Sequence, residues 1–302
     1  MKHVLRNTFA ALAVAASTTV LAQQGPVKII GLMELSGTGA TAGTNFDNGV
    51  KLAVKEINAA GGILGRKVDY QSWDTQTAPQ TAKALAQKAV DEGAYVVMGP
   101  VFSGSIIVSM AETKRAEIPN FTGGEAANIT QQGNHYIFRT SFTQSTAMPK
   151  IARYIKNDVK AKTVSVIWVN NDFGKGGRDA IVKALEAEGI KVAADISTDP
   201  GQVDFSGPVL KAKQSNADAL FVYTNEEESA RALRELKKQG YNKPIVGETT
   251  LTGQKVIELA GDAANGAVAH VGLTVDAPQP GIKAFDEKFQ KEYKYKLSLI
   301  HI

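Results

Sequence analysis

Short apolar runs alternate with amphipathic stretches along most of this chain. The apolar runs predict strands at Val27–Met33, Val68–Trp73, Tyr95–Met98, Ile118–Phe121, Val164–Val169, Leu220–Tyr223, Ile245–Gly247 and Ala267–Val271. Between them, apolar residues recur at helical spacing; Val50, Ala53, Val54 and Ile57 mark one such face, which ends at Gly61–Gly62. Strands that alternate with helices predict a parallel sheet covered by helices on both faces.

The alternation occurs in two successive series, which meet near Arg139–Met148. We therefore expect an α/β protein with two doubly wound parallel-sheet lobes. Lobe 1 is expected to comprise residues 23–141, with residues 272–302 returning to it, and lobe 2 residues 142–271. Open α/β sheets bind ligands beyond the carboxyl ends of their strands. Two facing lobes would thus enclose a ligand in a cleft and close on it about a hinge.

The first 22 residues have a different pattern. Lys2 and Arg6 precede an apolar run from Phe9 to Leu21, and the run ends in small residues at Ala22. This pattern predicts a secretory signal peptide that is cleaved after Ala22, with the mature protein in the periplasm. Removing two positive charges from the formal net charge of +4 leaves +2. The nearly neutral mature chain gives no indication of a nucleic-acid partner.

Composition and motifs argue against catalysis. The chain has no cysteine, which excludes thiolate zinc sites, iron–sulfur clusters and cysteine nucleophiles. Its histidines are isolated, and it contains no phosphate-loop or nucleophile-elbow motif. Gly37, Gly39 and Gly43 follow the first strand, but their spacing departs from the dinucleotide fingerprint, so a glycine loop beside the cleft is the better interpretation. We expect no enzyme activity, no cofactor and no metal.

Two loops at predicted strand ends combine glycine with polar groups. In Gly99–Ser105, the hydroxyl of Ser103 and the free N–H groups of a helix start could bind a carboxylate. Alternatively, Ser103 or Ser105 merely caps that helix. Thr122–Ala126 follows the next strand, and its glycines would let the backbone approach a ligand closely.

An ordered set of segments covers nearly the whole mature chain to about Tyr293. The segments are Leu35–Gly37, Asn48–Gly49, Glu56–Lys67, Asp74, Gly99–Pro100 with Ser103, Phe138–Thr140, Asp172–Gly174, Asp204–Ser206 and Leu259–Gly266. In these segments the chain resembles the periplasmic branched-chain amino acid binding proteins, which are the type I solute-binding components of ABC importers.

The resemblance implies that an amino acid is bound mainly through its zwitterion. The α-carboxylate would be bound by the Ser103 hydroxyl, and the ammonium by the Gly123 carbonyl and the Glu248 carboxylate. Phe173 would close over the ligand from the second lobe. The remaining expected contacts are Asn225 and Glu226 at another strand end.

Three positions depart from the family pattern. Glu125 stands where many relatives have threonine, and Phe173 lacks the hydroxyl that tyrosine would supply. Ala42 stands where leucine- and valine-binding relatives often place an aromatic residue. A carboxylate at Glu125 would favour a ligand with a positive group or repel a second ligand acid.

The sequence thus predicts an extracytoplasmic protein that captures an amino acid, branched-chain or related, and delivers it to the permease of an ABC importer. We expect a monomer. The alternative is a ligand-sensing receptor or regulator of the same fold that binds an amide or a carboxylate. A membrane-tethered sensor would need a transmembrane helix or a further domain, and neither is evident in the sequence.

The C-terminal pattern predicts a truncation. Ile282, Phe285 and Phe289 define a helical face that begins after Pro280–Gly281 and ends near Tyr293. The resembled family continues here for several tens of residues and crosses between the lobes once more, whereas Leu297–Ile302 does not match that continuation. We expect that the C-terminal part of lobe 1 is missing and that lobe 2 is the better-formed half. The alternative is a natural short variant that ends in a strand.

Overall fold

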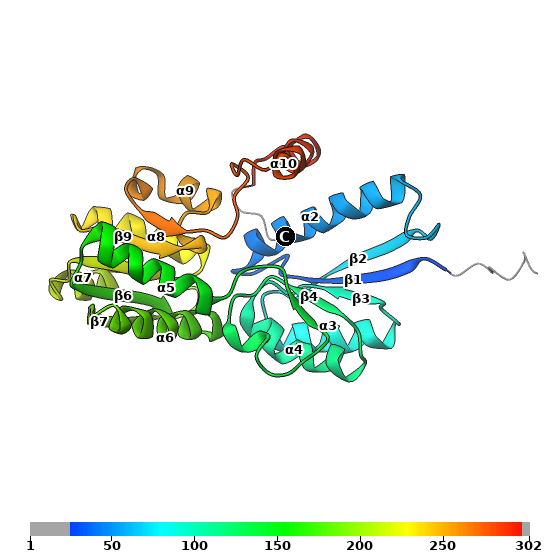
Figure 1. Ribbon diagram of the computed structural model, residues 1–302, viewed down its shortest axis with the longest axis horizontal. Coiled ribbons are helices and arrows are strands. Elements are labelled where there is room, and N and C mark those ends of the chain that lie inside the picture. The colour runs from blue at the N-terminus through cyan, green and yellow to red at the C-terminus, as the bar shows by residue number, and fades with distance from the viewer. Residues whose placement is uncertain (1–24, 298–302) are drawn as a thin grey trace, which may run out of the picture.

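The computed structural model describes residues 25–297, which form two α/β lobes (Figure 1). The first sheet has the order β2-β1-β3-β4-β5, and the second has the order β10-β9-β8-β6-β7. All pairings within both sheets are parallel, so the predicted fold class is confirmed. The strands are β1 Val27–Met33, β2 Val68–Asp74, β3 Val96–Met98, β4 Asn120–Thr122, β5 Ile137–Arg139, β6 Thr163–Val169, β7 Lys191–Thr198, β8 Ala219–Tyr223, β9 Ile245–Glu248 and β10 Val268–His270. The predicted signal peptide and the residues after Leu297 lie outside the described residues.

Helices cover both faces of the first sheet (Figure 1). Helices α3 (Pro79–Asp91) and α4 (Ser103–Arg115) lie on one face, where the small buried side chains of α3 pack against β1 and β3. Helix α2 (Ala40–Ala59) lies on the other face, where Phe46 packs against Met33.

Helix α10 (Pro280–Tyr293) comes from the far end of the chain and packs on α2. Its Ile282 and Phe289 are buried in one cluster with Leu52 of α2. The Tyr293 hydroxyl donates to the Asn48 carbonyl over 2.9 Å. Ion pairs of 2.7 Å join Lys55 to Glu292 and Lys288 to Glu56 at the rim.

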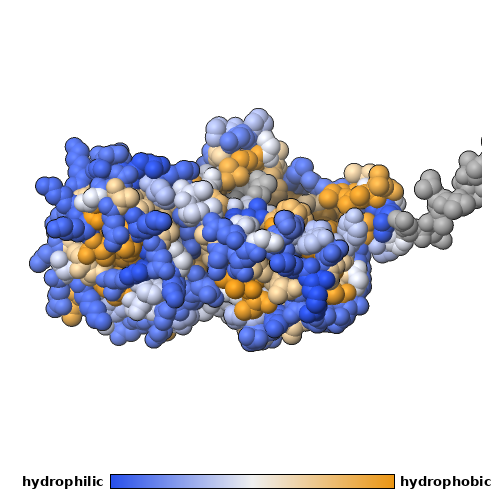
Figure 2. Space-filling view, turned by 60° about the horizontal axis from the view of Figure 1, so that its bottom comes forward, coloured by the Kyte–Doolittle hydropathy of each residue, from blue (hydrophilic) through white to orange (hydrophobic). Residues whose placement is uncertain are grey.

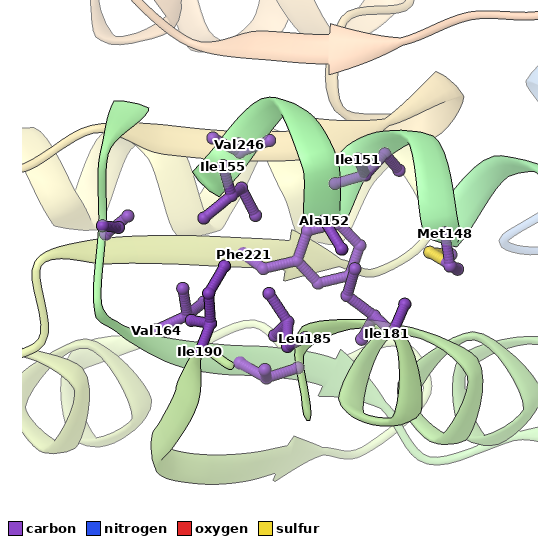
Figure 3. Close-up of a cluster of buried hydrophobic side chains, with 14 of the residues drawn as sticks. Met148, Ile151, Ala152, Ile155, Val164, Ile181, Leu185, Ile190, Phe221 and Val246 are labelled. Carbon is purple, nitrogen blue, oxygen red and sulfur yellow. The ribbon is translucent and has the colours of Figure 1, made fainter. Parts of the chain in front are cut away.

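The second sheet is also covered on both faces. Helices α5 (Gln144–Tyr154) and α6 (Asp172–Ala187) enclose the largest cluster of buried side chains, which Figure 3 shows around Phe221. Helices α7 (Ser206–Gln214), α8 (Glu226–Lys238) and α9 (Gln254–Ala260) cover the other face. The short helical turns are η1 Ala127–Ile129, η2 Ile155–Val159, η3 Thr249–Leu251 and η4 Gly261–Ala264.

Within residues 25–297 the chain crosses between the lobes after β5 and again after β10. The two crossings touch each other. A side-chain carbon added to Gly272 would lie only 2.2 Å from a ring carbon of Phe142. The Phe142 ring also meets the His270 ring edge-on, with 5.1 Å between centroids.

None of the helices in the described part of the chain is both long and apolar enough to cross a bilayer. Figure 2 shows a face that is mostly hydrophilic, with apolar side chains gathered in separate patches on both lobes.

Candidate ligand-binding site

A pocket lies between the two lobes at the carboxyl ends of strands from both sheets. The space between its walls, including the opening to solvent, is about 590 Å³. Its lining residues are Thr38, Ala42, Val101, Phe102, Ser103, Gly123, Gly124 and Glu125 from the first lobe and Phe173, Asn225, Glu226, Thr249 and Thr250 from the second. Lysine, arginine and histidine are absent from this lining, whereas two glutamates belong to it.

The start of α4 forms one wall. The buried carboxylate of Glu34 accepts the N–H groups of Val101 and Phe102 over 3.0 and 3.1 Å and so fixes the loop before the helix. Burial raises the pKa of Glu34 to about 7, against the lowering effect of these hydrogen bonds.

Ser103 is the first residue of α4, and the N-cap residue is Phe102. No side chain caps the helix, so the interpretation that Ser103 or Ser105 serves as its N-cap is wrong. The Ser103 oxygen accepts the Ala126 N–H over 3.2 Å and joins the two loops of this wall. Its hydroxyl proton and the first N–H groups of α4 form a favourable environment for an anion.

The loop after β4 lies opposite the start of α4. Gly124 packs closely there, since a side-chain carbon would lie 2.4 Å from the end of the Ile106 side chain and 2.9 Å from that of Ile129. The Arg139 guanidinium donates to the carbonyls of Gly124 and Ala126 and so holds the loop from behind. This loop presents the buried side chain of Glu125 to the pocket.

The second lobe contributes helix starts and strand ends. Phe173, in the first turn of α6, stacks on Tyr223 with 4.2 Å between ring centroids. Asn225 precedes α8, and its backbone N–H and side-chain amide both donate to the Glu228 carboxylate over 3.0 Å. Burial raises the pKa of Glu226, the first residue of α8, to about 7.

A buried hydrogen-bond network joins the lobes behind the pocket. The Tyr223 hydroxyl of β8 donates to the Glu125 carboxylate of the first lobe over 3.0 Å. The side-chain amide of Gln144 donates to the Tyr223 oxygen over 3.0 Å and to the Phe173 carbonyl over 2.7 Å. In addition, the Gln144 backbone N–H donates to the Glu125 carbonyl over 3.1 Å.

Glu248, at the end of β9, is fully buried beside this network. Its carboxylate accepts the Thr249 hydroxyl over 2.6 Å, and the His270 ring nitrogen lies 3.6 Å away. Burial raises the pKa of Glu248 to about 7. Burial also raises the pKa of Glu125 well above its usual range, and the nearby charge of Glu248 raises it further.

The sequence profile of the periplasmic binding protein family matches residues 26–301. The chain belongs to this family. A leucine-, isoleucine-, valine-, threonine- and alanine-binding protein of Pseudomonas aeruginosa is 28% identical over 262 residues, which are 86% of this chain and 68% of that protein. A leucine-specific-binding protein of Salmonella typhimurium is 27% identical over 296 residues, 97% of this chain and 79% of its own length.

Solved structures show the same similarity. The branched-chain amino acid transporter substrate-binding protein of Streptococcus pneumoniae, in complex with isoleucine, has a TM-score of 0.84 at 26% identity. The match covers 90% of this chain and 79% of that one. A solute-binding protein from R. palustris, in complex with benzoate, shares the fold with a TM-score of 0.84 at 22% identity over 91% of this chain and 76% of its own.

In this periplasmic binding protein, seven of the eight site residues that we predicted line one pocket: Ala42, Ser103, Gly123, Glu125, Phe173, Asn225 and Glu226. The eighth, Glu248, lies outside the lining and is buried next to the lining residue Thr249. Sequence reasoning missed Thr38, Val101, Phe102, Gly124, Thr249 and Thr250, although each is adjacent to a predicted loop or strand end. It also missed Tyr223 and Gln144.

The described residues offer no arrangement for a metal. Between Gly25 and Leu297, no cluster of three or more His, Cys, Asp or Glu side chains is placed to hold an ion. The pocket is lined by hydroxyls, backbone groups, carboxylates and apolar side chains.

Proposed function

We propose that this periplasmic binding protein captures an amino acid, branched-chain or related, and delivers it to the permease of an ABC importer. The single observation that carries the proposal is a pocket with an anion-binding helix start at one wall and buried carboxylates beside it. Relatives along nearly the whole chain are named as amino-acid-binding proteins. On this proposal the mature protein is periplasmic, monomeric and without catalytic activity, and its two lobes comprise residues 23–141 with 272–302, and 142–271.

Each end of the zwitterion has a proposed partner. The Ser103 hydroxyl and the first N–H groups of α4 bind the α-carboxylate. The Gly123 carbonyl and the acidic side chains bind the ammonium. Phe173 contacts the ligand from the second lobe together with Asn225 and Glu226, and Ala42 leaves room for the ligand side chain.

A second candidate function follows from the same wall. A carboxylate ligand without an ammonium group could bind at the start of α4 alone, as required of a sensor or transporter for simple organic acids. Pairs of ligands that differ only in the ammonium group distinguish the two functions. We would compare amino acids with their des-amino acids in thermal shift measurements on residues 23–302. Binding of the des-amino acids alone would rule out amino-acid capture.

Ser103→Ala tests the carboxylate contact. A hydrogen bond to a charged group contributes about 1.5–3 kcal/mol, so the variant should bind an amino acid about 10- to 150-fold more weakly by calorimetry. Ser109→Ala is the matched control, because Ser109 is equally buried on α4 and donates only to the Ile106 carbonyl over 3.3 Å. Equal affinities of the two variants would remove Ser103 from the site.

A further inference from the structure

Glu125 and Glu248 form a pair of buried acids between the lobes. Glu125 follows β4 in the first lobe and is 5% exposed, and Glu248 ends β9 in the second lobe and is 0% exposed. One oxygen of Glu248 receives no hydrogen bond from an N–H group or a hydroxyl, and the Glu125 carboxyl, which lines the pocket, is close enough to interact with Glu248. Two like charges in a low-dielectric site strongly disfavour joint ionisation, so at neutral pH the pair retains a proton.

The surroundings of the pair supply little compensating charge. The Tyr223 hydroxyl of β8 donates to Glu125, and the Thr249 hydroxyl donates to Glu248. The charge of Arg139 on β5 lowers the pKa of Glu125, but burial outweighs this effect, and the guanidinium donates its hydrogen bonds to the carbonyls of Gly124 and Ala126 and to the Thr130 hydroxyl.

Other elements add no positive charge to the pair either. His270 of β10 lies 3.6 Å from Glu248, but burial and the charge of Lys150 on α5 lower its pKa, so the ring is neutral at pH 7. On α8, Glu226 is a further acid at the pocket wall. Among the described residues, neither acid thus forms an ion pair with a lysine or arginine, and the charge of Arg139 offsets only part of the cost of burying the pair.

We propose that the cationic group of the ligand enters beside Glu125 and Glu248 and displaces the proton that these two carboxyls hold, so that ligand binding releases a proton to solvent. This inference rests on the proposed function and deepens it. It makes Glu125 a specificity-determining residue that selects for an ammonium group. The charges balance, because the O–H bond of the protonated carboxyl breaks, its proton passes to the buffer, and the incoming ammonium replaces that positive charge.

Calorimetry with the strongest hit among the twenty common amino acids tests the inference. Phosphate and imidazole differ in their enthalpy of ionisation. The difference in observed binding heat between titrations at pH 6.5 in these two buffers therefore gives the number of protons released. We expect between one half and one proton, with affinity rising up to tenfold per pH unit between pH 6 and pH 7. The measurement needs no variant, so it does not depend on a variant folding.

Three variants then locate the proton. Glu125→Gln should release fewer protons and reduce the preference for the amino acid over its des-amino acid about tenfold. Glu112→Gln is the control, because Glu112 is also buried but pairs with Lys83 and Arg115 at the far end of α4. Glu226→Gln tests the other pocket acid and should keep most of the release.

The outcomes separate the two proposals. An amino acid that binds without proton release, or whose release is lost in Glu226→Gln and kept in Glu125→Gln, overturns this inference and leaves the proposed function standing. Binding of des-amino acids in preference to amino acids overturns both.

Discussion

Gly177→Ala offers a sharp test of how the second lobe supports the site. Gly177 lies inside α6 and lines no part of the pocket. A side-chain carbon added there would lie 2.0 Å from a ring carbon of Tyr223, whereas ordinary contacts are 3.4–4 Å. The Tyr223 ring is fully buried between Phe173 and Phe221 and has no room to retreat. The variant must therefore displace α6 or Tyr223 by more than 1 Å, roughly the shortfall from ordinary packing distance.

The magnitude follows from three contributions. Overpacking of a dense core costs about 1–3 kcal/mol. Displacement of the Tyr223 hydroxyl also weakens its hydrogen bond to the Glu125 carboxyl group, which contributes about 0.5–1.5 kcal/mol when that group is neutral. Alanine favours the helical conformation over glycine by about 1 kcal/mol, which partly offsets these two losses. We expect a net loss of about 0.5–3.5 kcal/mol in the free energy of unfolding and weaker ligand binding.

Urea-induced unfolding of residues 23–302 measures the effect, and Gly281→Ala is the matched control. Gly281 lies in the first turn of α10 with nothing within 4 Å of the added carbon, so alanine there should stabilise the protein by about 0.4–1 kcal/mol. If Gly177→Ala were stabilising to the same extent, Tyr223 would not pack on α6 as described, and the network behind the pocket would lose its support.

Two further predictions concern stability. Phe289→Ala should destabilise the protein by about 3–5 kcal/mol in chemical unfolding, because Phe289 is fully buried between α10 and α2. Phe285 is only partly buried in the same cluster, so Phe285→Ala should cost less than half of that. Equal effects of the two substitutions would mean that α10 does not dock on α2. Burial raises the pKa of Glu34 from 4.5 to about 7, so folding takes up a proton there and the contribution of this group to stability falls as pH rises from 5 to 8. The stability difference between wild type and Glu34→Gln should therefore shrink by at most about 3 kcal/mol over that range, and a constant difference would contradict the raised pKa.

The strands were predictable where both faces of a sheet bury them. The run in Val164–Val169 is apolar almost throughout because helices cover both sides of β6. The edge strand β7 was missed, since its residues alternate between exposed and more buried positions and include Asp195, which binds Arg178 and Trp168 at the surface. Helix α7 was also missed, because Ser206-Gly207-Pro208 has the composition of a turn.

The predicted face of α2 was partly wrong. Ala53 and Ile57 are exposed, whereas Leu52 and Asp47 are buried. The buried face of α2 is thus rotated from the predicted one. Two hydroxyls of β2 explain the difference, because Tyr70 and Ser72 both donate to the Asp47 carboxylate over 2.7 Å. A polar residue usually indicates an exposed helix position, but a carboxylate that has hydrogen-bond partners can be buried. Periodicity alone cannot reveal those partners.

The pocket loops were predictable because polar residues beside glycine at strand ends have few structural uses. The buried network was not. Tyr223 ends an apolar strand and reads as core, and only the fold shows that its hydroxyl reaches Glu125 in the other lobe. Glu125 and Glu248 are 123 positions apart in the sequence, and the family resemblance assigns each to the ligand separately, so their mutual proximity emerges only from the three-dimensional arrangement.

The packing of Phe142 on Gly272 restricts how the lobes can move. Two connections that are held side by side allow rotation about the line through them but resist twisting and sliding, so the lobes have few relative degrees of freedom. A narrow set of open arrangements means that little orientational entropy is lost on closure, and less of the ligand's binding free energy is needed to offset it. A single hinge axis would also give the closed form a reproducible outer shape. A membrane partner that recognises the liganded form could therefore dock on a surface whose geometry is set as much by this hinge contact as by the ligand itself.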